Sequence, residues 1–428
     1  MNIQDIHNLF LQCKSLSIDT RKIEKDSMFF AIKGENFDAN TFAEEALKLG
    51  ALFVVIDNES YFIDERTILV KNSLEALQEL AKFHRAYLKL PIVALTGSNG
   101  KTTTKELINA VLSKKYKTKA TIGNLNNHIG VPLTLLSFTK ETEIGIVEMG
   151  ANHQKEIEFL CEIAQPDYGY ITNFGKAHLE GFGGVEGVIK GKSEMYQYLA
   201  KNDKVAFVNL EDPIQIEKSA GINSFTFGLN KNEADLNIKK IEANPFVVIN
   251  YESFSVESHL IGLYNANNIN AAVSIGYYFK VTDAAIKEAI ENYIPENNRS
   301  QLLKKDSNQI ILDAYNANPS SMAVAIANFL QLDSQNKIMI LGDMFELGIE
   351  SPQEHKAIVD SLSNQDKSVC YLIGKSFYEN KISSDNLHFY ETFDDFSAYL
   401  KTLKFNDNTI LIKGSRGMAL ERTLEYIS

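Results

Sequence analysis

Cysteine, proline and glycine are scarce in this chain of 428 residues, which has 3 Cys, 8 Pro and 24 Gly. The three cysteines, Cys13, Cys161 and Cys370, lie far apart and form no CxxC pair. This spacing argues against a sulfur-based metal site and indicates buried thiols in a reducing compartment. The low proline and glycine content leaves little room for a long low-complexity linker.

Long apolar runs and a positive charge balance are also missing. No apolar run approaches the ~20 residues that span a bilayer, and the first residues form no basic or apolar signal segment. The net charge of −12, from 43 Lys and Arg against 55 Asp and Glu, repels polyanions. We therefore expect a cytoplasmic protein with no nucleic-acid partner and no membrane insertion, although one anionic ligand could still bind in a locally positive pocket.

The remaining composition is that of a globular protein, with 44% hydrophobic and 23% charged residues. At about 150 residues per domain, the length suggests roughly three domains. Strand-like and helix-like segments alternate, which predicts an α/β fold with parallel sheets. Strands are predicted at 92–96, 144–148, 168–172, 204–209, 310–313, 337–341, 369–373 and 409–413. Helices are predicted at 102–113, 155–163, 266–278, 322–330 and 355–362. Turn-forming stretches at 90–91 and 295–300 divide the chain into units 1–89, 90–298 and 299–428.

The most informative segment is PIVALTGSNGKTTTKELINAVL, which begins at Pro91. An apolar strand ends at Thr96, a glycine turn follows, and a helix begins near Lys101. Backbone N–H groups and the helix N-terminus of such a loop attract phosphate. Lys101 would reach the β- and γ-phosphates, and the Thr102 hydroxyl would ligate Mg²⁺. The loop is shorter than the general phosphate-loop pattern, and it predicts an ATP or a GTP site.

Polar residues follow several other predicted strands. Glu148 ends one of them, where a carboxylate suits an Mg²⁺ ligand, a water-orienting group or a solvated strand end. His178, in the segment with Asn173 and Glu180, is a candidate metal ligand or phosphate contact, although a lone histidine is as often structural. Lys192 opens a helical segment and, taken alone, is a surface or helix-start lysine. Amide-rich strings at 123–132, 262–272 and 313–322 again stand where strands or loops meet helices.

These motifs resemble the Mur ligase family, ATP-dependent amide-forming enzymes of peptidoglycan precursor synthesis, over nearly the whole chain. The first unit has a uridine-nucleotide pattern at 18–22 and 26–40, and the middle unit has the family's short loop at 96–103. In the third unit, Tyr-Asn-Ala-Asn-Pro (315–319), the LGDM-x-ELG run (341–348) and KGSRGM (413–418) resemble the members that add D-alanyl-D-alanine. The DNPR signature of members that add diaminopimelate or lysine is absent.

The resemblance implies a three-domain architecture: a small N-terminal α/β domain for the UDP substrate (1–89), a central phosphate-loop parallel-sheet ATPase domain (90–298) and a C-terminal Rossmann-like domain for the dipeptide and closure (299–428). The implied catalytic residues are Lys101, His178 and Lys192. The implied ATP-binding residues are Gly97, Ser98, Asn99, Gly100, Lys101, Thr102, Thr103, Asn268, Arg299 and Asp313. The implied substrate-binding residues are Thr20, Arg21, Lys33, Gly34, Asp38, Asn173, Asn316, Asn318, Ser415 and Arg416. The implied ligands of two Mg²⁺ ions are Thr102, Glu148, His178 and Lys192, the last as a carbamylated lysine (N6-carboxylysine).

The implied partners are UDP-N-acetylmuramoyl-tripeptide and D-alanyl-D-alanine, joined through an acyl phosphate by a monomer whose third unit closes over the middle one. Tyr264 departs from the family, which often has histidine there, so no role for that imidazole carries over. Three alternatives stay open: another Mur ligase, a folylpolyglutamate synthetase-type amide ligase, and an ATP-gated binding module. The third residue of the tripeptide is not readable from the sequence.

Overall fold

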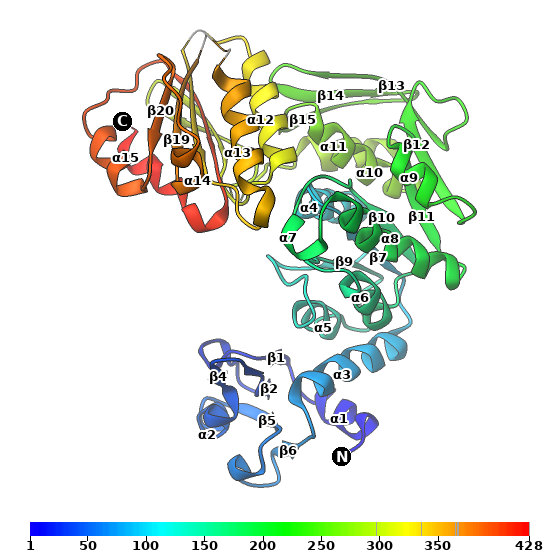
Figure 1. Ribbon diagram of the computed structural model, residues 1–428. Helices are drawn as coiled ribbons and strands as arrows, with labels where there is room; N and C mark the ends of the chain where they lie inside the picture. Colours follow the sequence, from blue (N-terminus) through cyan, green and yellow to red (C-terminus); the bar gives the residue numbers. More distant parts are fainter. Residues whose placement is uncertain (297, 335, 364, 366–367, 428) are drawn as a thin grey trace.

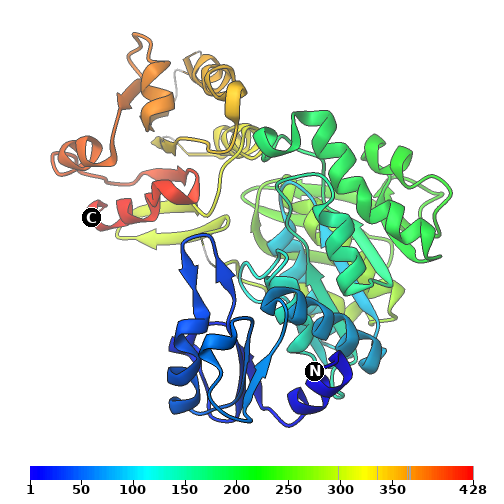
Figure 2. The ribbon, with the colours of Figure 1, turned by 60° about the horizontal axis from the view of Figure 1, so that its bottom comes forward.

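The computed structural model describes residues 1–296, 298–334, 336–363, 365 and 368–427. These residues form three large sheets in three successive parts of the chain, and one two-stranded sheet (Figure 1). The first sheet is parallel, in the order β1-β2-β5-β6. Its strands are β1 (Ser15–Ser17), β2 (Ser27–Phe30), β5 (Ala51–Ile56) and β6 (Thr67–Leu69). Its helices are α1 (Ile3–Phe10), α2 (Ala43–Lys48) and α3 (Ser73–Leu88). A short hairpin of β3 (Lys33–Gly34) and β4 (Phe37–Asp38) projects from this sheet (Figure 2).

The second sheet has nine strands in the order β15-β14-β13-β12-β11-β10-β7-β9-β8. Between β8 and β13, each pair of neighbouring strands is parallel. Strand β14 is antiparallel to both of its neighbours, β13 and β15. The strands that position the site are β7 (Ile92–Thr96), β9 (Ile144–Glu148) and β10 (Tyr168–Ile171). The others are β8 (Thr118–Ala120), β11 (Val205–Asn209), β12 (Ser224–Leu229), β13 (Leu236–Ala243), β14 (Phe246–Tyr251) and β15 (Ser255–Ile261). The helices of this part are α4 (Lys101–Leu112), α5 (Gly130–Leu136), α6 (Glu156–Ala164), α7 (Leu179–Phe182), α8 (Val185–Lys201), α9 (Pro213–Lys218), α10 (Tyr264–Tyr278) and α11 (Asp283–Glu291).

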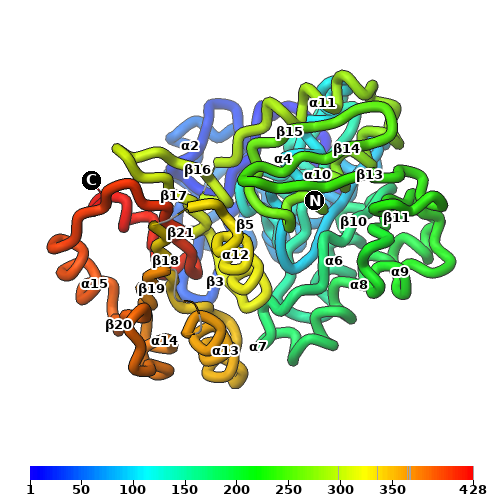
Figure 3. Tube along the Cα trace, turned by 90° about the horizontal axis from the view of Figure 1, so that it is seen from above, coloured from blue at the N-terminus to red at the C-terminus, as the bar shows by residue number. Residues whose placement is uncertain are grey.

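The third sheet has the order β16-β17-β21-β18-β19-β20, with only the edge strand β16 antiparallel to its neighbour among the described pairs. Its strands are β16 (Gln301–Lys305), β17 (Asn308–Asp313), β18 (Lys337–Gly342), β19 (Ser368–Ile373), β20 (Leu387–Tyr390) and β21 (Thr409–Lys413). Its α-helices are α12 (Pro319–Gln331), α13 (Ser351–Ser363), α14 (Lys375–Glu379) and α15 (Phe393–Leu400). Seen from above, α12 and α13 lie between this sheet and the central part, on the side of α7 (Figure 3).

The predicted α/β class is confirmed, and the strands β7 and β9 have the predicted bounds. The sheets are mainly parallel, as predicted, but β13 to β15 form an antiparallel meander. In β15 buried and exposed residues alternate along most of the strand, so only one face is covered. A half-exposed strand of this kind needs no flanking helix on its outer face. Asn297, within the predicted boundary stretch 295–300, lies outside the described residues.

Helix α3 attaches the first part of the chain to the second. Asn72 caps its N-terminus by accepting hydrogen bonds from two backbone N–H groups, a common helix start. Near the other end, Arg85 is 2.8 Å from Asp167 and also donates to the carbonyls of Ala164 and Gln165. The buried side chains of α3 belong to the same hydrophobic cluster as those of β7 and α6. No helix in the described ranges is long and apolar enough to cross a membrane.

A buried pair of histidines links α1 to α3. His7 Nε2 lies 3.0 Å from His84 Nδ1, and His84 Nε2 lies 3.0 Å from the carbonyl of Phe138. Burial lowers the pKa of His7 from 6.5 to about 4, with a further contribution from His84. Burial also lowers the pKa of His84, against a smaller opposing effect of its bond to Phe138. Both imidazoles are therefore neutral in the folded protein at pH 7.

We expect the stability of the protein to fall as the pH drops from about 6.5 towards 4. The unfolded chain binds protons at these two histidines near pH 6.5, whereas the folded chain resists protonation until about pH 4 for His7. The midpoint of urea unfolding, followed by circular dichroism at pH 7.5 and pH 5, measures this loss. His7→Leu should reduce the difference between the two midpoints, and the exposed His259→Gln should leave it unchanged. An equal difference in wild type and His7→Leu would contradict the expectation.

Candidate active site

The predicted phosphate loop connects β7 to α4, and its two glycines are required by the packing around them. Gly97 has a φ of +140°, and a Cβ on it would lie 2.0 Å from the Thr172 hydroxyl. Gly100 has a φ of +80°, and a Cβ there would lie 2.4 Å from the Asn268 amide oxygen. Lys101 begins α4, and its Nζ donates to the carbonyls of Gly97 at 2.7 Å and Ser98 at 3.3 Å. The loop is therefore pressed against two distant segments of the chain.

Asn99, at the tip of this loop, is held from both sides. Its N–H donates to the Asn173 amide oxygen at 3.1 Å, and its carbonyl accepts from Asn173 Nδ2 at 3.0 Å and from the Thr172 hydroxyl at 2.5 Å. Its side-chain oxygen accepts from Asn318 Nδ2 at 2.7 Å. Asn318 is the N-cap of α12 in the third part of the chain. The structure thus places Asn173 and Asn318 against the loop itself.

The carboxylate of Glu148 ends β9 beneath the loop and is 1% exposed. Its Oε1 accepts from Thr102 Oγ1 at 3.3 Å and from Asn126 Nδ2 at 2.8 Å. Its Oε2 is buried and has no hydrogen-bond partner among the described residues. A buried carboxylate oxygen without a donor next to a hydroxyl suits a hard cation such as Mg²⁺, which prefers oxygen ligands. Within those residues, no three His, Cys, Asp or Glu side chains gather into a metal-binding group.

Lys192 lies in the middle of α8 and is 1% exposed, so its interpretation as a surface or helix-start lysine is wrong. Its Nζ donates to the carbonyl of Ala151 at 3.1 Å and stands 4.9 Å from the centre of the Phe182 ring. Burial lowers the pKa of this amine well below 10.5, and the charge of Lys101 lowers it further. Burial likewise lowers the pKa of Lys101, an effect that Glu148 opposes and Arg299 reinforces.

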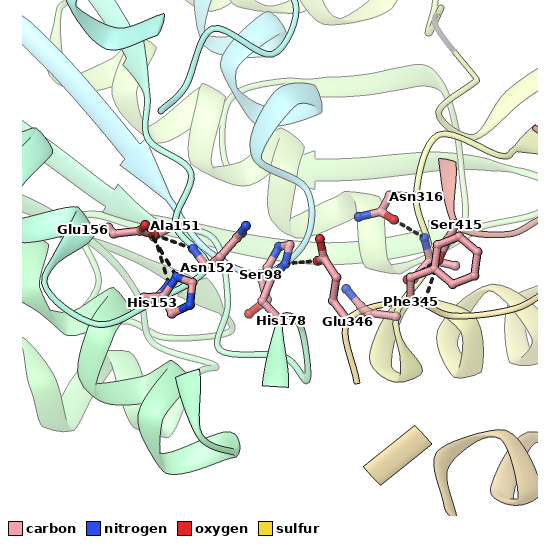
Figure 4. A network of polar contacts seen from close by, with 12 residues as sticks. Ser98, Ala151, Asn152, His153, Glu156, His178, Asn316, Phe345, Glu346 and Ser415 are labelled. Carbon is pink, nitrogen blue, oxygen red and sulfur yellow. Dashed lines mark hydrogen bonds and ion pairs between the residues drawn. The ribbon is translucent and has the colours of Figure 1, made fainter. Parts of the chain in front are cut away.

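His178 follows β10 in a left-handed conformation with φ of +52°. Its Nδ1 is bonded to the carboxylate of Glu346, which belongs to the third part of the chain (Figure 4). This bond holds the pKa of the Glu346 carboxyl below its usual range. Two residues earlier, Lys176 Nζ lies 2.5 Å from Glu354 on α13. The segment around His178 therefore meets the third part directly.

Asp313 ends β17, and both of its carboxylate oxygens are bonded. Oδ2 lies 2.6 Å from the buried Lys413 Nζ, and Oδ1 accepts from the Ser300 N–H at 3.1 Å. Beside it the guanidinium carbon of Arg299 lies 3.7 Å from the centre of the Tyr315 ring. The guanidinium carbon of Arg416 lies 4.9 Å from the same ring centre. Two predicted arginines thus share one aromatic ring.

The remaining predicted residues of the third part lie close by. Ser415 is buried, its hydroxyl accepting from the Phe345 N–H at 2.9 Å and lying 3.3 Å from the Ala317 carbonyl (Figure 4). Asn316 accepts from the Ala317 N–H through its own side chain. In the central part, Asn268 bonds to the Thr104 hydroxyl and to Asn265. Asn268 therefore braces α4 against α10 directly under the phosphate loop.

A cavity of about 680 Å³ unites most of these residues. The predicted residues that line it are Ser98, Asn99, Gly100, Lys101, Thr102, Thr103, Glu148, Asn173, His178, Asn268, Arg299, Asp313, Asn316 and Asn318. Gly97, Lys192 and Arg416 contact the lining residues Lys101, Ala151 and Tyr315, and Ser415 lies two positions after the lining residue Lys413. The cavity is built from the second and third parts of the chain.

The predicted residues of the first part lie outside this cavity. Thr20 and Arg21 form a short 3-10 helix, and the Arg21 guanidinium donates to the Asp19 carboxylate at 2.8 and 2.9 Å. Lys33 and Gly34 are exposed on the β3–β4 hairpin, and Asp38 accepts from Asn40 at 2.7 Å. These five residues belong to the first part of the chain, with Thr20 and Arg21 between β1 and β2 and the other three on the β3–β4 hairpin.

Sequence reasoning gave no role to several residues that line or adjoin the cavity. Asn126 is bonded to Glu148, and its only signal was the amide-rich string at 123–132. Tyr264 lines the cavity, and its hydroxyl lies 2.8 Å from that of Ser300. Glu346 reaches His178 from a segment 168 residues away. Only the LGDM-x-ELG motif drew attention to it.

Known proteins of one family are similar to this chain over nearly its whole length. Family models match residues 12–85 (Mur ligase family, catalytic domain), 95–276 (Mur ligase middle domain) and 298–416 (Mur ligase, glutamate ligase domain). The UDP-N-acetylmuramoyl-tripeptide–D-alanyl-D-alanine ligase of Bacillus subtilis (strain 168) is 33% identical and aligns over 96% of this chain and 92% of its own. The enzyme of the same name from Escherichia coli (strain K12) is 33% identical, over 96% and 93%.

Solved structures agree with these relatives. The crystal structure of MurF from Acinetobacter baumannii has a TM-score of 0.86 and 30% identity, covering 99% of this chain and 98% of that one. MurF ligase from Thermotoga maritima in complex with ADP has a TM-score of 0.85 and 28% identity, covering 97% of both chains. The likeness therefore extends to the arrangement of all three parts.

Proposed function

This chain belongs to the Mur ligase family, and from that membership we propose the reaction that its cleft performs. It is an ATP-dependent ligase that joins D-alanyl-D-alanine to UDP-N-acetylmuramoyl-tripeptide in peptidoglycan precursor synthesis. The observation that carries the proposal is the single cavity in which the phosphate loop meets the third-part motif around Asn316 and Asn318. Full-length relatives of that name from Bacillus subtilis and Escherichia coli support the same activity.

The chemistry requires activation of a carboxylate. A carboxylate repels an incoming amine and has no usable leaving group, so its oxygen first attacks the γ-phosphorus of ATP. The bond between the γ-phosphorus and the bridging oxygen breaks, which gives an acyl phosphate and ADP. The dipeptide amine then attacks the acyl carbon, and the tetrahedral intermediate expels phosphate as the amine loses its proton. Because water hydrolyses an acyl phosphate, the site must close around it.

Positive groups of this chain hold the triphosphate. Lys101 and the N–H groups at the start of α4 face the place where the phosphates would lie, and Arg299 stands across the cavity. We assign the ribose to Asp313 and the adenine edge to Asn268, with Gly97, Ser98, Asn99, Gly100, Thr102 and Thr103 around the phosphates. The net charge of −12 thus coexists with a locally positive phosphate site.

Mg²⁺, which neutralises the charge between the triphosphate and the carboxylate when it is bound, fits the residues of this cavity. Thr102 and Glu148 would hold one ion, because Glu148 has a buried oxygen without a donor. His178 and Lys192 would hold a second ion, and Lys192 needs a carboxylate at its tip to do so. Burial lowers the pKa of the Lys192 amine, which favours the neutral form whose lone pair can attack CO₂, forming an N–C bond and releasing a proton.

The division of work follows the three parts of the chain. We assign the UDP moiety to unit 1–89 through Thr20, Arg21, Lys33, Gly34 and Asp38. Unit 90–298 binds ATP, and Asn173 shapes the end where the peptide carboxylate meets the γ-phosphate. Unit 299–428 holds the dipeptide through Asn316, Asn318, Ser415 and Arg416 and closes the cleft. One chain supplies all these groups, which supports a monomer, and reliance on ATP and a UDP precursor supports a cytoplasmic location.

Purified protein should release phosphate from ATP and Mg²⁺ only when both UDP-N-acetylmuramoyl-tripeptide and D-alanyl-D-alanine are present. The reason is that the acyl phosphate forms only on the bound peptide and is consumed only by the bound amine. A coupled phosphate assay measures the rate, with each substrate omitted in turn and with single amino acids replacing the dipeptide. Vigorous phosphate release when both substrates are absent would exclude the proposed ligase activity. Tripeptides that differ only at the third residue then show which one is preferred.

A further inference from the structure

Glu346 has no role in the reaction as described so far, yet it reaches into the site from the third part of the chain. It follows β18 in the LGDM-x-ELG motif and lies in a left-handed conformation with φ of +61°. Its carboxylate is bonded to Nδ1 of His178 (Figure 4). We propose that Glu346 is a positioning residue that fixes the His178 imidazole when the third part docks on the central part.

The direction of this bond determines the state of the imidazole. A glutamate is ionised at neutral pH, and an ionised carboxylate only accepts hydrogen bonds. In the neutral imidazole of His178, Nδ1 is therefore the nitrogen that carries the proton, and Nε2 keeps its lone pair. A carboxylate bonded to one ring nitrogen commonly orients a histidine whose other nitrogen binds a metal or a substrate oxygen. Glu346 thus selects the tautomer that the assigned role of His178 needs.

The Glu346 side chain is 54% exposed, but the backbone on its N-terminal side is anchored. The N–H of Phe345 donates to the buried Ser415 hydroxyl at 2.9 Å. The N–H of Met344 donates to Nε2 of His355, a residue with no exposed surface, at 3.0 Å. The side chain of Glu346 is therefore presented from a fixed loop and pays little entropy to meet His178.

The segment of the central part around Glu180 packs closely against the loop that carries Glu346. The Glu180 N–H lies 3.4 Å from the Glu346 carbonyl. Gly348 packs so closely on Glu180 that an added Cβ would lie 3.1 Å from its side chain. Lys176 and Glu354 form a second ion pair of the same interface, away from the imidazole. The contact that docks the third part on the central part therefore also orients His178.

The inference rests on the proposed function for the task of His178, but its first test does not require activity. Nitrogen-15 NMR of labelled histidine side chains at pH 8.5 reports which ring nitrogen carries the proton. In wild type we expect the Nδ1–H form for His178. In Glu346→Ala we expect a shift to the Nε2–H form or to a mixture, and Glu354→Gln should leave the wild-type signal. A Glu346→Ala signal identical to wild type would overturn the proposal.

Kinetics provide the second test. Glu346→Ala should lower kcat by about 10- to 100-fold, the usual effect of losing such an orienting partner. Glu346→Gln should retain more activity, since its amide oxygen still accepts from Nδ1–H. Glu354→Gln, which weakens the same interface elsewhere, should stay within about twofold of wild type. An equal loss of kcat in the Glu346→Ala and Glu354→Gln variants would show that Glu346 acts only as an interface contact, which would overturn the proposal. Failure of the wild-type phosphate assay would instead refute the ligase, with the tautomer result unaffected.

Discussion

Replacing Lys101 with methionine should lower the rate of substrate-dependent phosphate release by roughly 10²- to 10³-fold. Methionine keeps much of the length of the side chain but removes the positive charge that stabilises the triphosphate as its terminal phosphorus is transferred. Lys101 sits at the start of α4, where the loop and the helix N-terminus converge. The initial rate with both substrates saturating is the measurement, together with calorimetric binding of ATP.

The matched control is Lys114→Met. Lys114 follows the same helix and pairs with Glu288 at 2.7 Å on the surface, so its charge faces a partner outside the loop. This variant should keep the wild-type rate. A Lys101→Met rate within threefold of wild type, in a folded protein, would remove Lys101 from the phosphate site.

Lys192→Ala should lower the rate by on the order of 10²-fold or more, since a metal ligand contributes several kcal/mol to the transition state. Added formate or acetate should restore part of the activity, because a free carboxylate can enter the space left by the side chain. The wild-type protein, incubated with ¹³C-bicarbonate, should show a carbamate signal in its NMR spectrum that the variant lacks.

Lys190 provides the comparison for this experiment because it lies on the same helix and is exposed. Lys190→Ala should keep its activity and show no response to acetate. An unchanged rate in Lys192→Ala would exclude a ligand role for that residue. Loss of the rate in a folded protein that neither formate nor acetate restores, with no carbamate signal in wild type, would limit Lys192 to packing against Phe182 and Ala151.

The local part of the site could be predicted from the sequence because it depends on neighbours in the chain. The strand that ends at Thr96, the glycine turn and the helix that begins at Lys101 all lie within twenty residues. Glu148 was predicted for a similar reason, as a carboxylate at the end of an apolar strand. The α/β class also followed from local patterns, since buried parallel strands form short continuous apolar runs.

Contacts between distant segments could not be predicted in this way. The bonds of Asn99 to Asn318 and of His178 to Glu346 join residues 219 and 168 positions apart. The burial of Lys192 depends on how α8 packs, and a helix-start pattern cannot reveal that. The antiparallel strands β13 to β15 were missed because half-exposed strands have weak apolar runs.

The position of β7 in the middle of its sheet has a consequence for synthesis of the chain. Its neighbours are β10 and β9, so Ile92–Thr96 pairs with strands that are made about fifty and eighty residues later. Asn173, which holds the tip of the loop, comes later still. Until β9 and then β10 have been made, the apolar strand β7 lacks one or both of its neighbours, and the loop lacks Asn173. Such segments are prone to aggregate, so we expect a chaperone to benefit the growing chain while residues 97 to 173 are being made.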